Sequence, residues 1–484
     1  MIVIGTGVGG TAAGALLARE GWRVLFLEKN PRPGGACSFY VKEGVHVDLG
    51  AHFFSSGNCG PIGEVQRRLG SRQLVRFVDS EPLLRLQGPG VDLSVSLRLR
   101  SLLGLFPDLL RQTGIPAREI PGLLGRMLLP VALPDRGIET LDSRSVEDYF
   151  LAGTDRARFL LVISIFMGLY FVIPYMQASL GEATWCTKKA LQAREPGYPL
   201  GGAVAVPLAF LEAARALGAR VRLNARAARI RVEGGRVAGV EDAEGRFFSG
   251  RVVVSNTSLR DTVRLAGEEQ FPPAYRQQVE ESRGSLSAVQ AKILLDRPLV
   301  REGILVGIRD RRASPGGALT AADVRLGWED IEAGRVPRVF SFYCPVPTNF
   351  DPGLAPRGMQ LLTVTSCLPG CDRVSVDGPQ VWIDAMLETL FEIRPDLREH
   401  VVWIDRFDNR FLESWLGKQG GPVISTCQDT RQVGRQRQPQ ETPLTGLFVV
   451  GDSAGGRGIG TELACRSGME GADLVMRALR CGGL

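Results

Sequence analysis

The sequence predicts an α/β fold, with one domain built on a parallel, doubly wound sheet and a second domain of α+β type. Three observations carry this prediction. Apolar runs that end in glycine turns stand near both chain ends, at Gly5–Gly10 and at Gly451-Asp452, and residues 198–256 alternate helix-like and strand-like patterns between them. Alternation of strands with helices is typical of parallel sheets with crossover helices.

The first element is the strand Met1–Ile4, which leads into Gly5-Thr-Gly7-Val-Gly9-Gly10 and then into a helix over 11–20. A second strand over 23–27 ends at Glu28, which stands 18 residues after Gly10. In this Rossmann-type arrangement Gly5 permits the tight turn, Gly7 lets the backbone approach a pyrophosphate, and Gly10 lets helix and strand pack closely. The free N–H groups at the helix N-terminus bind phosphate and Glu28 accepts from ribose hydroxyls, so we expect a bound dinucleotide.

The residues after Glu28 indicate which dinucleotide the chain binds. Lys29 is followed by the pair Gly34-Gly35, and Gly50-Ala51-His52 follows a second apolar run. This combination resembles the extended FAD fingerprint (GR2-like) of the flavin-dependent amine oxidase and phytoene desaturase superfamily. In that family an arginine often follows the glycine pair, whereas Ala36 and Cys37 stand here. The resemblance implies FAD as the cofactor, with Ala36 and the two glycines under its ribityl and pyrophosphate groups.

The last elements are a strand that ends at Gly451-Asp452, the loop Gly458-Ile459-Gly460-Thr461, and a helix from about Glu462 to Leu479. They resemble the C-terminal flavin signature of the same superfamily. The resemblance implies that Asp452 binds a ribityl hydroxyl. It also implies that the positive end of the last helix faces the flavin pyrimidine, where it stabilises negative charge.

The middle block begins at Tyr198 with a turn at Gly201-Gly202. We expect a helix over 205–217, strands over 220–232 and 237–242, and a closing strand over 251–256. In the superfamily this block returns to the cofactor domain, which would place Ala227 by the adenine. The cofactor domain is therefore expected to comprise 1–65, 195–262 and 425–484, and the substrate domain 66–194 and 263–424.

The apolar segment 159–180 contains no charged residue over its 22 residues, which is long enough for a membrane span. A single crossing would place the two FAD half-sites on opposite sides of the bilayer, so we expect a buried helix interrupted at Gly168 and Pro174. It would line an apolar tunnel with Phe159, Phe166, Tyr170 and Phe171. Segment 97–133 mixes short apolar patches with arginines, which is typical of a lipid-contacting surface and equally of a core helical subdomain.

Composition excludes several other classes of protein. Hydrophobic residues make up 44% of the chain, so it is not a disordered one. Nine cysteines are too few for a disulfide scaffold, three histidines leave no expected metal site, and a net charge of +6 without a basic stripe argues against nucleic acid. The sparse cysteines lead us to expect reduced thiols and a cytoplasmic location, with peripheral membrane contact left open. Because the chain opens directly on a strand, we expect no signal peptide.

The chemistry is expected from the branch that the sequence resembles. An amine oxidase has a lysine near the flavin on the strand before an Asp-Arg-Pro turn. Here Gln290 falls at that position and Lys292 lies two residues later, on the same strand face. No aromatic cage for an amine is evident, and the loop Gly455–Gly460 resembles that of the phytoene desaturase, carotenoid isomerase and retinol saturase branch.

In that branch the flavin exchanges hydride with C–C or C=C bonds of a long apolar isoprenoid, in a desaturase, saturase or isomerase. The candidate catalytic residues are Glu462 as proton acceptor, with Arg457 and His52 beside the ring. The position of Glu462 favours an ordinary first-turn glutamate, stabilised by the helix dipole, over a proton acceptor, and Cys427 is a weak candidate for a covalent flavin link. The alternatives are a flavin-dependent amine oxidase and a non-catalytic binder of prenylated proteins like the Rab escort proteins.

Overall fold

The computed structural model describes residues 1–71, 74–96, 112, 116, 118, 120–150, 157–193, 197–311, 320–370 and 378–482. Its first unit is a parallel five-stranded sheet in the order β19-β13-β1-β2-β9. The strands are β1 (Ile2–Ile4), β2 (Leu25–Leu27), β9 (Arg220–Arg222), β13 (Val253–Ser255) and β19 (Leu447–Val449). The sheet therefore takes strands from the beginning, middle and end of the chain, which confirms the α/β fold with a Rossmann-type domain.

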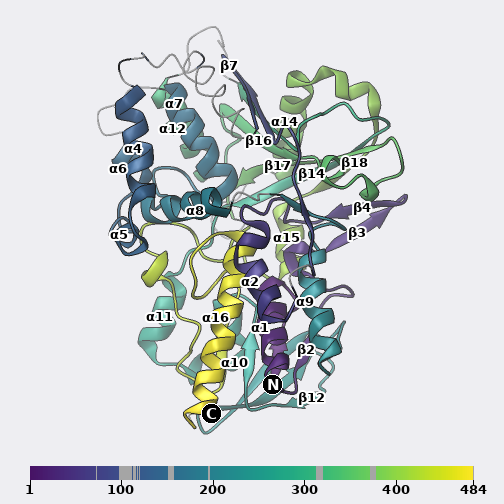
Figure 1. The fold of residues 1–484 in the computed structure, drawn as a ribbon, viewed down its shortest axis with the longest axis vertical. Coiled ribbons are helices and arrows are strands. Elements are labelled where there is room, and N and C mark those ends of the chain that lie inside the picture. Colours follow the sequence, from purple (N-terminus) through teal and green to yellow (C-terminus); the bar gives the residue numbers. More distant parts are fainter. Residues whose placement is uncertain are drawn as a thin grey trace.

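Both faces of this sheet are covered (Figure 1). Val3, Phe26 and Val254 face one buried cluster, and Ile2, Leu27 and Val253 face another, because alternate residues of a strand point to opposite faces. The first cluster packs against α1 (Val8–Arg19), α2 (Pro61–Arg68), α9 (Ala205–Ala216) and α16 (Gly460–Arg480). The second packs against the antiparallel sheet β10 (Ala227–Glu233), β11 (Arg236–Asp242), β12 (Phe247–Ser249) and against α10 (Leu259–Ala266) and α11 (Pro273–Glu281).

The single strand expected over 220–232 is wrong, since two strands occupy it. β9 ends at Arg222, and Asn224 takes a positive φ of 51°. The N–H of Ala225 then donates to the carbonyl of Glu28 at 2.8 Å. This turn sends the chain off the parallel sheet and into β10, past the end of β2. Asparagine tolerates the left-handed conformation better than most residues, which is the local signal for the break.

The second unit is a seven-stranded sheet in the order β18-β14-β17-β16-β15-β6-β7, in which only β15 and β6 pair in parallel. Its strands are β6 (Leu84–Gly88), β7 (Val91–Val95), β14 (Ser287–Leu295), β15 (Ile304–Asp310), β16 (Val339–Pro345), β17 (Gln360–Leu368) and β18 (Val401–Phe407). The remaining helices are α4 (Ile120–Ala132), α5 (Asp135–Glu139), α6 (Val146–Phe150), α7 (Ala157–Phe166), α8 (Leu180–Ala193), α12 (Ala321–Glu332), α13 (Pro347–Phe350), α14 (Pro379–Ile393) and α15 (Asn409–Leu416). Two further strand pairs, β3 (Phe39–Lys42) with β4 (Val45–Asp48) and β5 (Phe77–Val78) with β8 (Tyr198–Pro199), lie outside these sheets.

The charge-free segment 159–180 folds as a buried helix that ends earlier than expected. Helix α7 stops at Phe166, a π-helical turn follows over Met167–Phe171, and Val172 closes it with a φ of 54°. A Cβ at Gly168 would lie 2.5 Å from the Trp328 ring, so this glycine lets α12 pack closely. Across the described part of the chain, none of the helices has both the length and the apolar character that a membrane span requires. The Phe159 side chain and most of 97–119 lie outside the described residues.

Candidate active site

One large cavity of about 1380 Å³ lies between the two sheets. On one side it is lined by the carboxyl ends of β1, β2 and β13, by helix α15 and by the first turn of α16; on the other it is lined by β6, β7, β15 and α7. Ligands of open α/β sheets bind at the carboxyl ends of the strands. The two half-sites expected from opposite chain ends therefore meet around one space.

The first half-site is the glycine turn between β1 and α1. Gly5 has a φ of +90°, a conformation that favours glycine, and Gly7 precedes the first turn of α1 without any side-chain cap. A Cβ at Gly10 would lie 2.4 Å from the Gly5 carbonyl, and one at Gly7 would lie 2.8 Å from the Asn256 amide. The turn thus leaves bare backbone and free helix N–H groups facing the cavity, which fits a pyrophosphate.

Glu28 is positioned by backbone at the end of β2. Its carboxylate accepts from the Thr6 amide at 2.9 Å, from the Thr6 hydroxyl at 2.7 Å and from the Asn30 amide at 2.9 Å. A carboxylate offers about four lone-pair sites, so capacity for a ribose hydroxyl remains. This donor set fits the adenosine ribose of a dinucleotide.

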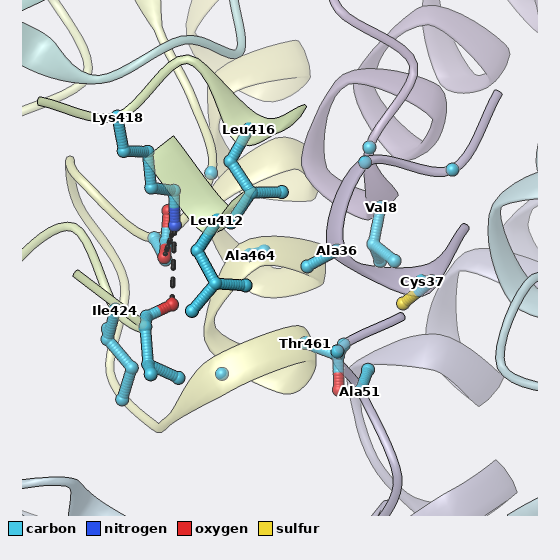
Figure 2. A pocket seen from close by; sticks show the side chains of 18 of the residues that line it. Val8, Ala36, Cys37, Ala51, Leu412, Leu416, Lys418, Ile424, Thr461 and Ala464 are labelled. Atoms are coloured by element: carbon cyan, nitrogen blue, oxygen red, sulfur yellow. Dashed lines mark hydrogen bonds and ion pairs between the residues drawn. The ribbon is translucent and has the colours of Figure 1, made fainter. Parts of the chain in front are cut away.

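Asp452 marks the second half-site, at the end of β19. Its carboxylate accepts from the Lys418 ammonium at 2.7 Å and from the Ser425 amide and hydroxyl, each at 2.9 Å. Burial alone would raise the pKa of Asp452, but the Lys418 charge and these hydrogen bonds outweigh it and lower that pKa. Figure 2 shows Lys418 reaching along the cavity wall beside Leu412, Leu416 and Ile424, with Ala36 and Ala51 across the space.

The N-terminus of α16 completes this end of the cavity. Gly460, Thr461 and Glu462 line it, and no side chain caps the helix. α16 lies close against α1, since a Cβ at Gly468 would be 2.2 Å from the Gly9 carbonyl. Two uncapped helix N-termini therefore face one cavity, an arrangement that fits a ligand with negative charge at both places.

Most of the residues expected at the cofactor line this cavity. Besides those above they are Gly9, Lys29, Gly34, Gly35, Ala36, Gly50, Ala51, His52, Ala227, Gly451 and Ile459. Gly10 lies behind the turn, and the Gly458 amide donates to Glu182 at 2.6 Å on the wall of a second cavity. Cys427 is buried next to the cavity-lining segment Val423–Ile424.

The three candidate catalytic residues lie apart. Arg457 binds Asp142 and, at 3.0 Å, Glu182, and it lines the second cavity rather than the large one. His52 lines the large cavity, and its Nε2 lies 3.1 Å from the Lys292 ammonium. Glu462 lines both cavities. The roles of all three remain predictions.

Strand β14 presents Gln290, not Lys292, to the large cavity. Lys292 is fully buried behind His52, and burial lowers its pKa from 10.5 to about 7 although Asp48 and Cys344 act in the opposite direction. Burial and the Lys292 charge hold the pKa of His52 well below its ordinary 6.5. That Gln290 takes the position of an amine oxidase lysine stays a prediction.

The far end of the cavity is apolar. Among the described residues that β6, β7, β15 and α7 contribute, all are aliphatic or aromatic, namely Leu84, Leu86, Leu93, Val95, Ile165, Phe166, Ile304 and Val306. Tyr170 and Tyr343 add their rings, and Phe166 stacks on Tyr170 with ring centroids 5.3 Å apart. Such a wall binds apolar surface at about 25 cal/mol per Å² removed from water.

Several site residues were missed from the sequence. Asn256 follows the buried strand β13 directly, and a polar residue at the carboxyl end of a parallel strand is a signal that could have found it. Lys418 and Ser425 come from a loop with no recognisable pattern. Ser55 reaches Glu462 across more than 400 residues of chain, a distance that no local pattern reports.

The chain is similar to known proteins in sequence and in fold. The family model described as flavin containing amine oxidoreductase matches residues 8–476. A zeta-carotene-forming phytoene desaturase of Myxococcus xanthus is 26% identical, over 96% of this chain and 91% of that protein. The chloroplastic prolycopene isomerase of Arabidopsis thaliana is 24% identical, over 75% of this chain and 62% of that protein.

One shorter match has a higher sequence identity than these two. The all-trans-retinol 13,14-reductase of Homo sapiens is 44% identical over 63 residues, which are 13% of this chain and 10% of that protein. Among solved structures, an oxidoreductase from Methanosarcina mazei superposes with a TM-score of 0.72 at 20% identity, covering 98% of this chain and 99% of the other. Cyclohexylamine oxidase from Brevibacterium oxydans gives 0.61 at 18% identity, with 99% of each chain covered. These two likenesses show the fold.

Proposed function

The chain belongs to the flavin-containing amine oxidoreductase family, and we propose that it is an FAD-dependent oxidoreductase acting on C–C or C=C bonds of a long apolar substrate of carotenoid or isoprenoid type. The observation that carries this proposal is the large cavity, because it joins the glycine turns to the apolar end formed by β6, β7, β15 and α7. This apolar end is called the apolar lobe below. The names of the desaturase, isomerase and reductase relatives indicate substrates of this kind.

The residues of both half-sites fit FAD. The α1 N-terminus at Gly7 would bind the pyrophosphate, Glu28 the adenosine ribose and Asp452 the ribityl chain, with Gly460 and Thr461 at the flavin pyrimidine. When bound, this cofactor supplies hydride transfer. The chain itself orients the substrate in the apolar lobe, excludes water from it, and holds Glu462 at its boundary as a proton acceptor or donor.

An amine substrate fits this lobe poorly. A bound ammonium requires a carboxylate or the faces of aromatic rings. Apart from Glu462 at the boundary, the described residues at the apolar end supply no carboxylate, so the rings of Tyr343 and of Tyr170, which is stacked on Phe166, would have to bind the ammonium. A polyene needs only apolar area.

The deciding experiment is an anaerobic flavin-reduction screen with polyenes and prenols on one side and small amines on the other. We expect reduction by a polyene or prenol. Leu86→Glu, which places a charge in the apolar lobe, should abolish that reduction while flavin content stays unchanged. Val402→Glu, at an exposed position of β18, is the matched control and should behave like wild type. Rapid reduction by an amine with no response to any polyene would favour an amine oxidase instead.

Access to the lobe is proposed to be from a membrane surface. Helix α4 exposes three consecutive large apolar side chains, Met127, Leu128 and Leu129, to 47%, 58% and 65%. Both α4 and α7, whose half-exposed Phe166 lines the cavity, lie at the same end of the molecule (Figure 1). Vesicle flotation tests this contact: Leu128→Glu with Leu129→Glu should reduce binding, and high salt should weaken binding of the wild type without abolishing it. Flotation unchanged by the double substitution would refute the contact.

A further inference from the structure

Three polar side chains are joined by hydrogen bonds in a continuous series that runs from the apolar lobe to the second cavity. The Tyr170 hydroxyl donates to Ser55 Oγ at 2.9 Å, and the Ser55 hydroxyl donates to Glu462 Oε2 at 2.7 Å. They come from the π-helical turn after α7, from the loop between β4 and α2, and from the first turn of α16. Three separate elements thus bring their polar atoms into one line.

The direction of this chain follows from its chemistry. An ionised carboxylate only accepts hydrogen bonds, so the Ser55 hydroxyl must point its proton at Glu462. The remaining lone pairs of Ser55 then accept from Tyr170. The Ser56 amide, at 2.6 Å, and the Ser56 hydroxyl, at 3.2 Å, also donate to Glu462 and fix its rotamer. Every donor therefore points toward the carboxylate.

The two ends of the chain lie in different surroundings. Tyr170 and Ser55 line the large cavity, whereas Glu462 also lines the second cavity of about 310 Å³. Exposed side chains such as Arg67 and Gln192 stand on the wall of this second cavity, so water reaches it. The other charged or titratable groups that line it are Cys59 of the loop before α2, Glu64 and Arg67 of α2, Cys186 and Lys189 of α8, Arg457 of the loop before α16 and Arg466 of α16.

We propose that Tyr170, Ser55 and Glu462 form a proton relay between the substrate lobe and the water of the second cavity. The proposal rests on the proposed function, because breaking or forming a substrate C–H bond releases or consumes a proton in a lobe whose described lining is mostly apolar. A relay through hydroxyls lets the carboxylate stay at the boundary of the apolar lobe, because burying a charge among apolar side chains is costly.

The transfers balance as follows in the direction of desaturation. The substrate C–H proton moves to Tyr170 Oη as the Tyr170 proton moves to Ser55 Oγ and the Ser55 proton to Glu462 Oε2. The C–H electron pair becomes the new π bond, while hydride from the neighbouring carbon is taken by the oxidised flavin of the proposed function. Glu462 then loses its proton to the second cavity, and a saturase would run the same chain in reverse. Burial raises the pKa of Glu462, although Ser55 and Ser56 act in the opposite direction, which favours a carboxyl that can both take and release the proton.

The first test needs no substrate. Infrared titration of the flavin-loaded protein should show a carboxyl band that is absent in Glu462→Gln and whose midpoint lies above 4.5, the ordinary pKa of a glutamate. Ser55→Ala should raise that midpoint further, because the ionised form loses a hydrogen bond. Ser55→Thr keeps the hydroxyl and should restore it. A midpoint that Ser55→Ala leaves unchanged would overturn the relay.

The second test follows proton release with an indicator dye during single-turnover flavin reduction by a polyene. General acid–base groups contribute roughly 100-fold or more in rate, so Glu462→Gln and Tyr170→Phe should slow reduction and proton release together by about that factor. Glu64→Gln is the matched control, since Glu64 lines the second cavity but pairs with Arg67. Wild-type rates in both relay variants would overturn the proposal. If no polyene reduces the wild type, the proposed function fails and the infrared titration alone decides the relay.

Discussion

Replacement of Lys292 by methionine should stabilise the protein at neutral pH and much less at alkaline pH. Lys292 is fully buried on β14, and burial lowers its pKa from 10.5 to about 7. The unfolded chain therefore binds one more proton than the folded chain between these two values, and the stability of the wild type rises with pH across that window. Below about pH 7 the cost of the buried charge is present in full, and above about 10.5 it is absent.

The magnitude follows from the same two values. Each pH unit corresponds to about 1.4 kcal/mol, so the full window corresponds to about 5 kcal/mol, and the interval from pH 7 to pH 9 to about 3 kcal/mol. His52, the hydrogen-bonding partner, does not disturb this interval, because its pKa is held well below 6.5 and it stays neutral throughout. The loss of its donor in Lys292→Met adds a cost that does not vary with pH there.

The assay is urea unfolding in excess flavin at pH 7, 8 and 9, reported as the difference between wild type and variant at each pH. Taking the difference cancels every group that the two proteins share. Leu294→Met, two residues along the same strand face and equally buried, is the control and should give a difference independent of pH. A Lys292→Met difference that is also flat would refute the reasoning, since it would mean that Lys292 keeps one protonation state in the folded and unfolded chain.

Other predictions concern the cofactor half-sites and the α1–α16 contact. Gly7→Trp should give colourless protein, because the new side chain fills the space before the α1 N-terminus; full flavin occupancy by absorbance would contradict this. Asp452→Asn should weaken flavin binding by roughly ten-fold in a fluorescence titration, since the Lys418 ammonium loses its charged partner. Gly468→Ala should lower the free energy of unfolding by about 1–3 kcal/mol, because its Cβ would lie 2.2 Å from the Gly9 carbonyl. Gly122→Ala, with open space around it on α4, should instead raise that free energy by up to about 1 kcal/mol, and the reverse order of these two would argue against the packing described here.

The cofactor end of the site was predictable because its requirements are local. A turn with positive φ at Gly5, a bare approach at Gly7 and an acid at the end of the next strand are each recorded within a few residues of sequence. The parallel sheet follows from the same patterns, since buried strands alternate with helices at both chain ends. The break at Asn224 was missed because continued strand-like residues on both sides hid a single left-handed position.

The substrate end was less predictable because its contacts are long-range. Tyr170 and Ser55 are 115 residues apart, and Ser55 and Glu462 are 407 apart. Their meeting depends on how a π-helical turn, a loop and a helix N-terminus pack, none of which has a sequence signature of that kind. Tyr170 was predicted only as a lining residue of the apolar tunnel, and the sequence context of Glu462 favoured an ordinary first-turn glutamate over a proton acceptor.

One strand of the substrate domain separates the two leading functions. Gln290 and Lys292 share a face of β14, but only Gln290 lines the large cavity, while the Lys292 ammonium lies against His52 behind the wall. Lys292 does not line the large cavity, whereas His52, its hydrogen-bonding partner, does. Burial lowers the pKa of Lys292 to about 7, which favours the neutral amine above that pH, and the lobe keeps an uncharged surface. An uncharged lobe of this kind suits a polyene, whose binding depends on area, whereas its described residues offer an ammonium aromatic rings and, at the boundary, the Glu462 carboxylate.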